Sequence, residues 1–249
     1  MKNLENIHEI IKGKTEEEAI KALAEAFPGK VVFSTSLGYE DQVITHFIFS
    51  KDLPVRIFTL DTGRLFKETL DVLGETEKKY KKSIEVFYPV RDSVKTLVRE
   101  KGENSFYESV ENRKECCYIR KVEPLKRALA GNEIWITGIR SEQSGGRKEM
   151  PQLEWDEANQ IVKYHPILNW TFEEVKLFVS RNNIPYNSLH GRGYVSISCE
   201  PCTRAIKEGE DFRAGRWWWE NSSVKECGLH LSPVGGGVDQ GSTEEEIKE

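Results

Sequence analysis

Residues 30–64 read KVVFSTSLGYEDQVITHFIFSKDLPVRIFTLDTGR, and this stretch decides the fold. The short apolar runs at 30–34 and 55–60 predict two buried strands, and the segment 40–50 between them predicts a helix. The alternation continues downstream, with helices expected from 65 to about 82, at 93–101 and at 112–130, and strands at 84–88 and 134–138. Strands that alternate with helices of this length predict an α/β fold, in which helices cover both faces of a twisted, mostly parallel sheet.

Further elements are expected at both ends of this unit. Apolar residues at helical spacing predict a helix near residues 4–11, and two capping boxes, Thr15 with Glu18 and Thr171 with Glu174, begin helices that end near residues 27 and 182. Ile161–His165 is predicted as a strand at the sheet edge. We expect N-terminal helices in 1–29, an α/β domain in 30–210, a mobile C-terminal segment in 211–231 and a disordered acidic tail in 232–249.

The composition excludes several classes of protein. The chain has 249 residues, with 36 basic and 41 acidic side chains and a formal net charge of -5. The last 18 residues carry five acids and one lysine, so the rest of the chain is nearly neutral. This balance argues against a nucleic-acid binder. No apolar run is long enough to span a membrane, and the N-terminus lacks the apolar run of a signal peptide, so we expect a cytoplasmic protein.

Three loops that follow predicted strands are rich in groups that bind anions. They are FSTSLGYED at 33–41, LDTGR at 60–64 and TGIRSEQSGGR at 137–147. Such loops meet at the carboxyl ends of parallel strands, where backbone N–H groups and arginines bind phosphate. Each loop alone is equally compatible with an ordinary turn or a solvated charged loop, whereas the three together favour a nucleotide site. The first loop matches neither of the two best-known nucleotide motifs.

The five cysteines indicate the chemistry of the chain. Cys116 and Cys117 are adjacent, Cys199 and Cys202 form a CxxC pair, and Cys227 stands alone. A helix would bring Arg120 and Lys121 one turn from the first pair, and cations there suit the negative charge of a thiolate-bound iron-sulfur cluster. Zinc and a set of buried thiols without a ligand remain alternatives. Cys227 lies near Lys225 and His230, which can lower the pKa of a thiol and make it a nucleophile, although an exposed cysteine without a role is also compatible with its position.

Seven motifs together resemble those of one family. They are FSTSLGYED, LDTGRLF, ECCYIRKVEPLKRALAG, TGIRSEQS, PYNSLHGRGYVSISCEPCTR, RAGRWWWE and KECGLH, and they extend from about residue 31 to 230. In this order they resemble the assimilatory adenylyl-sulfate (APS) reductases, which belong with the phosphoadenylyl-sulfate (PAPS) reductases. The resemblance implies an adenine-nucleotide α-hydrolase-like (PP-loop) fold and thioredoxin-dependent reduction of adenylyl sulfate to sulfite and AMP, a step of sulfate assimilation towards cysteine biosynthesis. It does not extend to the acidic tail.

The resemblance also implies roles for particular residues. One [4Fe-4S] cluster would be held by Cys116, Cys117, Cys199 and Cys202. Cys227 would attack the substrate sulfur and form an S-sulfocysteine, which thioredoxin or a glutaredoxin-like donor reduces. The remaining catalytic residues would be Lys121, Arg213, Arg216 and His230. Substrate binding would fall to Ser34, Ser36, Gly38, Leu60, Asp61, Thr62, Gly63, Arg64, Gly138, Arg140 and Arg147.

Three rival functions remain at this point. A reductase for phosphoadenylyl sulfate, or for both nucleotides, is disfavoured because members specific for that substrate generally lack the cysteine pairs. An ATP-dependent sulfur transferase of the same fold would carry Ser-Gly-Gly-x-Asp-Ser in the first loop, which here reads SLGYED. An iron-sulfur or zinc sensor that binds nucleic acid is disfavoured by the charge balance. The sequence leaves open whether the chain forms a homo-oligomer.

Overall fold

The computed structural model describes residues 4–143 and 147–220, and its centre is one six-stranded sheet. The strands are β1 (Val31–Thr35), β2 (Arg56–Leu60), β3 (Glu85–Phe87), β4 (Ile134–Ile136), β5 (Leu153–Asp156) and β6 (Ile161–Tyr164). Their order is β3-β2-β1-β4-β6-β5, and only β5 is antiparallel to its neighbour. The order reverses direction at β1, between β2 and β4. In open α/β sheets ligands bind at such a reversal, beyond the carboxyl ends of the strands.

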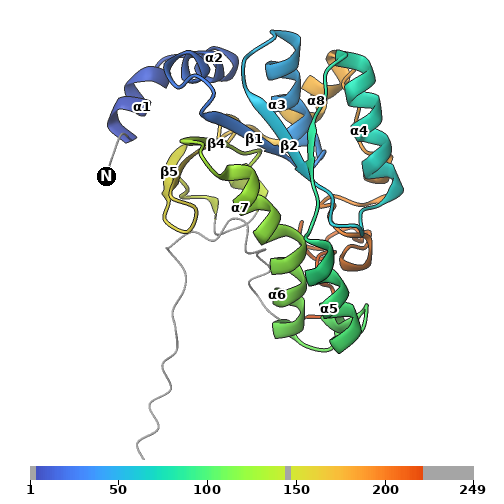
Figure 1. The fold of residues 1–249 in the computed structure, drawn as a ribbon. Coiled ribbons are helices and arrows are strands. Elements are labelled where there is room, and N and C mark those ends of the chain that lie inside the picture. Colours follow the sequence, from blue (N-terminus) through green and yellow to red (C-terminus); the bar gives the residue numbers. More distant parts are fainter. Residues whose placement is uncertain (1–3, 144–146, 221–249) are drawn as a thin grey trace, which may run out of the picture.

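Helices lie on both faces of this sheet (Figure 1). The longer helices are α1 (Leu4–Ile11), α2 (Glu16–Ala26), α3 (Tyr39–Ser50), α4 (Lys67–Tyr80), α5 (Arg91–Lys101), α6 (Val110–Cys117), α7 (Glu123–Leu129) and α8 (Phe172–Arg181). Short 3-10 turns occur at Ser105–Tyr107, Ser141–Gln143, Ser188–Arg192 and Glu200–Cys202. Both predicted capping boxes are present, because each threonine accepts from the third helical backbone N–H and each glutamate accepts in return.

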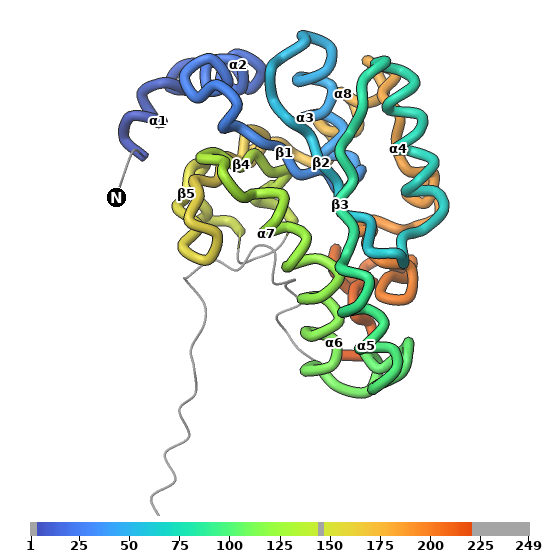
Figure 2. Tube along the Cα trace, in the orientation of Figure 1, coloured from blue at the N-terminus to red at the C-terminus, as the bar shows by residue number. Residues whose placement is uncertain are grey.

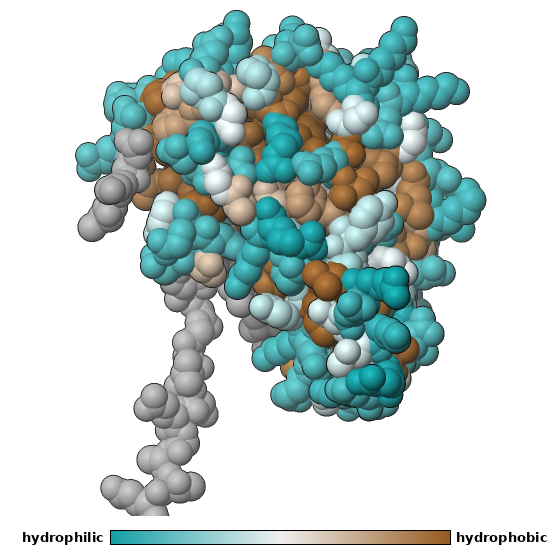
Figure 3. Space-filling view, in the orientation of Figure 1, coloured by the Kyte–Doolittle hydropathy of each residue, from teal (hydrophilic) through white to brown (hydrophobic). Residues whose placement is uncertain are grey.

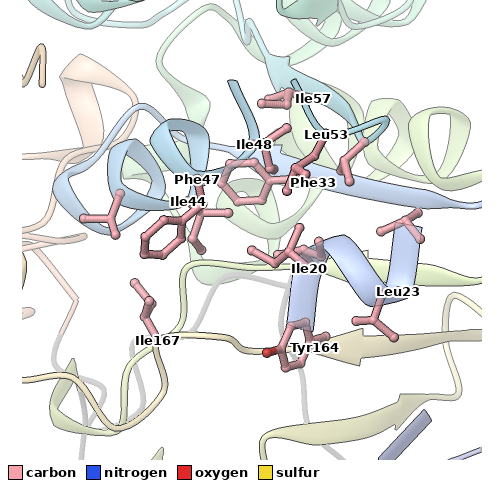
Figure 4. Packing of buried hydrophobic residues seen from close by; sticks show 14 of the residues in the cluster. Ile20, Leu23, Phe33, Ile44, Phe47, Ile48, Leu53, Ile57, Tyr164 and Ile167 are labelled. Atoms are coloured by element: carbon pink, nitrogen blue, oxygen red, sulfur yellow. The ribbon is translucent and has the colours of Figure 1, made fainter. Parts of the chain in front are cut away.

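The larger core lies on the face of the sheet that α1 to α4 and α8 cover. Figure 4 shows part of it, with Ile20 and Leu23 of α2 near Tyr164 of β6. On the opposite face, a smaller cluster joins α7 to side chains such as Trp135 of β4. Helices α5 and α6 lie beside the last described residues rather than over the centre of the sheet (Figures 1 and 2). These last residues and α6 form a third cluster, which contains cysteines.

The strand at residues 161–164 is not at the sheet edge, which corrects our expectation. It lies between β4 and β5, and the sequence pattern did not predict β5. The physical reason is that β5 buries charged side chains. Glu154 and Asp156 face Lys163 of β6, whose ammonium lies 3.3 and 2.7 Å from their carboxylates. Hydrophobic periodicity, the signal used to find strands, is therefore absent here.

The predicted helix at 112–130 forms, but not as one regular α-helix. Residues Tyr118–Val122 make a π-helical turn between α6 and α7, immediately after Cys116 and Cys117. Such turns occur often at functional sites. Among the described residues, no helix is both long and apolar enough to cross a membrane. In the space-filling view of Figure 3, the outer edge of the molecule is mostly hydrophilic. Cys227, His230 and the predicted tail at 232–249 lie outside the described residues.

Candidate active site

A cavity of about 250 Å³ opens where the loops after β1, β2 and β4 meet. Its wall includes ten of the residues predicted to form the site, namely Ser34, Ser36, Gly38, Leu60, Thr62, Lys121, Gly138, Arg147, Arg213 and Arg216. Because these residues come from five separate parts of the chain, their convergence is a result of the fold. The cavity lies at the reversal of strand order.

The loop after β1 is held by a carboxylate of the chain itself. Asp41 accepts hydrogen bonds from the Ser36 backbone N–H and hydroxyl, at 2.5 and 2.6 Å. The Leu37 N–H donates to Thr35 Oγ1, and Leu37 adopts a left-handed φ of 62°. The anion cradle predicted here is therefore partly occupied by internal hydrogen bonds. Burial raises the pKa of the Asp41 carboxyl to about 6, although the bonds from Ser36 act in the opposite direction.

Gly138, after β4, provides the space for this carboxylate. A Cβ at Gly138 would lie 2.1 Å from Asp41 Oδ1 and 3.3 Å from the Asp41 backbone nitrogen. Any side chain here would therefore displace Asp41, which in turn holds Ser36. The loops after β1 and β4 are thus interlocked at the cavity wall, and glycine is required because the two backbones approach closely.

The loop after β2 places only part of its motif in the cavity. Leu60 and Thr62 line the wall, whereas Asp61 accepts from the Gly63 N–H in the tight turn that the sequence allowed as an alternative. Arg64 donates to the Glu103 carbonyl and to Asn104 Oδ1, at 2.5 and 2.8 Å. Asp61, Gly63 and Arg64 are therefore absent from the cavity wall in this structure.

The two arginines of the loop after β4 have different positions. Arg140 is 1% exposed and bonded to Glu40, to Glu142 and to a backbone carbonyl, so it ties the loop to α3 and does not line the cavity. Arg147 does line the cavity, and its guanidinium donates to the Gln143 amide oxygen Oε1 at 2.5 Å. The loop thus contributes one cation to the wall, rather than the two expected.

Four cationic side chains, Lys121, Arg147, Arg213 and Arg216, gather at the cavity wall. Lys121 lies on the π-helical turn and its ammonium donates to Ser198 Oγ at 2.5 Å. Arg216 is 7% exposed, and its Nε has no partner among the described residues. Lys121, Arg147 and Arg216 are buried, and cations removed from bulk water bind and stabilise anions more strongly than exposed cations do. The wall is therefore suited to an anionic ligand.

The four described cysteines form a cluster next to this cavity. Cys116, Cys199 and Cys202 are buried, and Cys117 packs against them. Thr62 Oγ1 lies 3.2 Å from Cys199 Sγ, and the Arg120 guanidinium donates to the Thr62 carbonyl at 2.7 Å. Burial and the neighbouring Cys199 raise the pKa of the Cys202 thiol to about 12. The two cysteine pairs, 82 positions apart in the sequence, are thus brought together by the fold, as the sequence suggested.

Within the described ranges, no three or more His, Cys, Asp or Glu side chains are grouped so that they could hold one metal ion. A four-iron cluster makes a different demand, since each of its four thiolates binds a different iron. Two further observations concern its fit. Among the residues that the structure describes, the Trp217 indole N–H, buried in the cysteine cluster, has no hydrogen-bond partner, and neither has the buried Nε of Arg120. Donors and cations of this kind suit the negative charge of a thiolate-bound cluster.

Several wall residues were not predicted. They include Asp41, Trp135, Thr137, His190 and the segment 195–198. Trp135 looked like an ordinary strand residue, but its indole N–H donates to Ser34 Oγ at 2.8 Å. Thr137, His190 and the segment 195–198 lie within motifs quoted above, and Asp41 ends the first of them, but nothing in the sequence distinguished these residues from their neighbours in the same motifs.

Comparison with known proteins agrees with this geometry. Residues 30–205 match the phosphoadenosine phosphosulfate reductase domain. The chain belongs to this family. A protein of Burkholderia cepacia named adenosine 5'-phosphosulfate reductase is 53% identical over 205 residues, which cover 82% of each chain. One of the same name from Allochromatium vinosum is 54% identical over 200 residues, covering 80% of this chain and 78% of that protein.

Solved structures give the same assignment of fold. The crystal structure of a Candida auris phosphoadenylyl-sulfate reductase, described as a phosphate complex, has a TM-score of 0.68 at 26% identity and covers 83% of this chain and 98% of that one. A Candida glabrata FMN adenylyltransferase, with 16% identity and a TM-score of 0.53, covers 89% of this chain and 77% of its own length, and shares the fold alone. The mostly parallel nucleotide-binding α/β architecture of the phosphosulfate reductase family is therefore confirmed.

Proposed function

We propose that this chain is an adenylyl-sulfate reductase, which converts adenylyl sulfate to sulfite and AMP in sulfate assimilation. The observation that carries the proposal is the cavity at the carboxyl ends of β1, β2 and β4, with four cations on its wall. An adenine nucleotide with a phosphosulfate group has an apolar base and a compact anionic end. The cavity offers apolar side chains such as Leu60 and Leu125 for the former and Lys121, Arg147, Arg213 and Arg216 for the latter.

The reaction requires a nucleophile, for which we propose Cys227. Its thiolate attacks the substrate sulfur, the bond between that sulfur and the phosphate oxygen breaks, and AMP leaves with the electron pair. The protein then carries an S-sulfocysteine. A reduced dithiol, supplied by thioredoxin or a glutaredoxin-like protein, donates two electrons, releases sulfite and becomes a disulfide. These donors are kept reduced in the cytoplasm, where we propose that the enzyme acts.

The cavity cations have a defined task in this step. Negative charge develops on the phosphate oxygen as its bond to sulfur breaks. Lys121, Arg213 and Arg216 line the cavity and can stabilise that charge as it develops. We propose that the segment 211–231, described only as far as residue 220, brings Cys227 and His230 to this cavity.

We further propose that Cys116, Cys117, Cys199 and Cys202 hold one [4Fe-4S] cluster. The support is the burial of three of these cysteines in one cluster with Cys117 packed against it, the hydroxyl of Thr62 beside Cys199 and the buried indole N–H of Trp217. When bound, such a cluster would supply a fixed negative charge and cross-link the two cysteine segments. Lys121 and Ser198, which follow and precede these cysteines and bond to each other, would then connect that charge with the cavity wall.

The decisive experiment combines a visible spectrum of protein purified without oxygen with a thioredoxin-coupled sulfite assay. We expect brownish protein with about four irons per chain and sulfite release from adenylyl sulfate. Cys227→Ser should retain iron and bind AMP, but release no sulfite and retain no labelled sulfur. Cys199→Ser should lose iron. A colourless protein with stoichiometric zinc would disprove the cluster, and stable labelling of Cys227→Ser would place the nucleophile elsewhere.

The second candidate is reduction of phosphoadenylyl sulfate, favoured by the structural similarity to the Candida auris enzyme. The relatives named for adenylyl sulfate are about twice as similar in sequence, which is why we prefer the unphosphorylated substrate. Comparing kcat/KM for the two nucleotides tests this choice. A higher value for the 3'-phosphorylated substrate would reverse it.

A further inference from the structure

A buried ion pair connects the cysteine-bearing helix to the last described residue. Arg113 of α6, one turn before Cys117, donates through Nε and Nη2 to both carboxylate oxygens of Glu220, at 2.6 and 3.1 Å. Only 7% of the Arg113 side chain and 6% of the Glu220 side chain are exposed. A bidentate ion pair that is removed from water in this way fixes the relative position of its two side chains, because separating them would leave a buried charge without its partner.

The same arginine supports one face of Trp217. The Arg113 guanidinium carbon lies 4.3 Å from the centre of the indole ring, and that of Arg216 lies 4.8 Å from it. Trp217 is 1% exposed, and its backbone N–H donates to the Cys202 carbonyl at 3.2 Å. Its φ of 41° is unusual for a bulky residue and is maintained only where surrounding contacts enforce it. The enforcing contacts here are the two arginines and the cysteine cluster.

These contacts end at the cavity. Arg216 lines the cavity wall, and a β-bridge pairs it with Thr203, one residue after Cys202. Its guanidinium therefore rests against a ring whose position depends on Arg113. Two guanidinium groups at one ring repel each other, and Glu220 neutralises the one that is farther from the cavity. The Arg113–Glu220 pair thus keeps Trp217 in place while Arg216 remains available to a ligand.

We propose that Arg113 and Glu220 are positioning residues, which hold Arg216 in the nucleotide cavity through Trp217. This inference rests on one part of the proposed function, namely that the cavity binds an adenine nucleotide with an anionic group. It adds a physical connection between α6, which carries Cys116 and Cys117, and a cation of the binding wall. Neither Arg113 nor Glu220 lines the cavity, so both act through other side chains.

A double-mutant cycle tests the proposal in the full-length, iron-containing protein. Arg113→Met removes the fork while keeping an unbranched side chain, and Arg216→Met removes the cavity cation. We expect each single change to raise the dissociation constant of AMP and the KM for adenylyl sulfate about tenfold. If Arg113 acts through Arg216, adding Arg113→Met to Arg216→Met should change these constants less than about twofold.

A purely structural role predicts another result. It would lower the yield of folded, iron-containing protein and leave the AMP dissociation constant of the surviving fraction unchanged, which would overturn the proposal. The proposal would also be overturned if Arg113→Met raised the AMP dissociation constant by the same factor in the wild-type protein and in Arg216→Met. If Arg113→Met does not fold, Arg113→Lys, which keeps the charge but not the fork, takes its place in the cycle.

A control variant lies on the same helix. Glu115→Gln breaks the exposed ion pair with Lys101 at 2.6 Å and should leave the AMP dissociation constant unchanged. The outcome also separates this inference from the proposed function. If the wild-type protein binds AMP but releases no sulfite, the reductase assignment fails, and the cycle still tests the positioning role through the AMP constant alone.

Discussion

Replacing Asp41 by asparagine should make the protein more stable above pH 7. Burial raises the pKa of this carboxyl from 3.8 to about 6. Because the folded-state pKa lies above the unfolded one, the protonated carboxyl favours folding. This contribution is complete below about pH 4 and is lost as the pH rises through 6. At about 1.4 kcal/mol for each pH unit, the ionised side chain costs about 3 kcal/mol at pH 8.

Asparagine is neutral at every pH and avoids this cost. Both Ser36 donors bond to the same carboxylate oxygen, Oδ2, and the single amide oxygen of asparagine can accept both bonds. A neutral amide oxygen is a weaker acceptor than a carboxylate, which costs about 1 kcal/mol. The net expected gain for Asp41→Asn is about 2 kcal/mol at pH 8 and less than about 1 kcal/mol at pH 5. For a chain of this size the gain at pH 8 corresponds to an increase in Tm of about 4–8 °C.

Calorimetric scans at pH 5 and pH 8, at one scan rate and without oxygen, measure this difference. The exposed Asp71, which pairs with Lys67 on α4, offers a control, and Asp71→Asn should change the free energy of unfolding by less than about 0.5 kcal/mol at either pH. A lower Tm for Asp41→Asn at pH 8 would refute the reasoning, because the ionised carboxylate would then stabilise the fold.

Two further substitutions test the cavity wall. Gly138→Ala should weaken AMP binding, measured by titration calorimetry, at least tenfold, since the new Cβ would lie 2.1 Å from Asp41 Oδ1. The control Gly74→Ala, on α4 with no atom near the new Cβ, should raise the free energy of unfolding, measured by thermal scans, by about 1 kcal/mol. Unchanged AMP binding by Gly138→Ala would contradict the interlock of the two loops. Thr62→Val removes the hydroxyl 3.2 Å from Cys199 Sγ and should speed the loss of iron to a chelator severalfold, measured by absorbance; an unchanged rate would show that this contact does not stabilise the cluster.

The sequence predicted most of the fold because its signals are local. Strands β1 and β2 are short apolar runs, and both capping boxes can be identified from residues three positions apart. The strand β5 was missed for a reason that is not local. Glu154 and Asp156 are tolerated inside the protein because both pair with Lys163 on the neighbouring strand, and Asp156 also accepts from Asn159. A pattern of buried residues within one strand contains no information about such a partner.

The same limit applies to the arginines of the site. Arg140 and Arg147 lie in one loop and look equivalent in the sequence. The structure pairs Arg140 with Glu40, 100 positions away, and leaves Arg147 on the cavity wall. Arg64 likewise donates a hydrogen bond to Asn104, 40 positions away, and does not line the cavity. Residue type indicates that a loop can bind an anion, but tertiary pairing decides which side chains remain available for it.

Asp41 connects the stability of the chain with its proposed activity. Asp41 has no cationic partner among the described residues, so its buried carboxylate lowers stability at neutral pH. Its two bonds to Ser36 shape the loop that borders the nucleotide cavity. Asp41→Asn should therefore be more stable and yet bind AMP less tightly, because a neutral amide oxygen holds the two Ser36 donors more weakly than the carboxylate does. General damage to the fold would lower both properties together. Opposite changes in Tm and AMP affinity in one variant would show that this carboxylate is retained for binding, at a cost in stability.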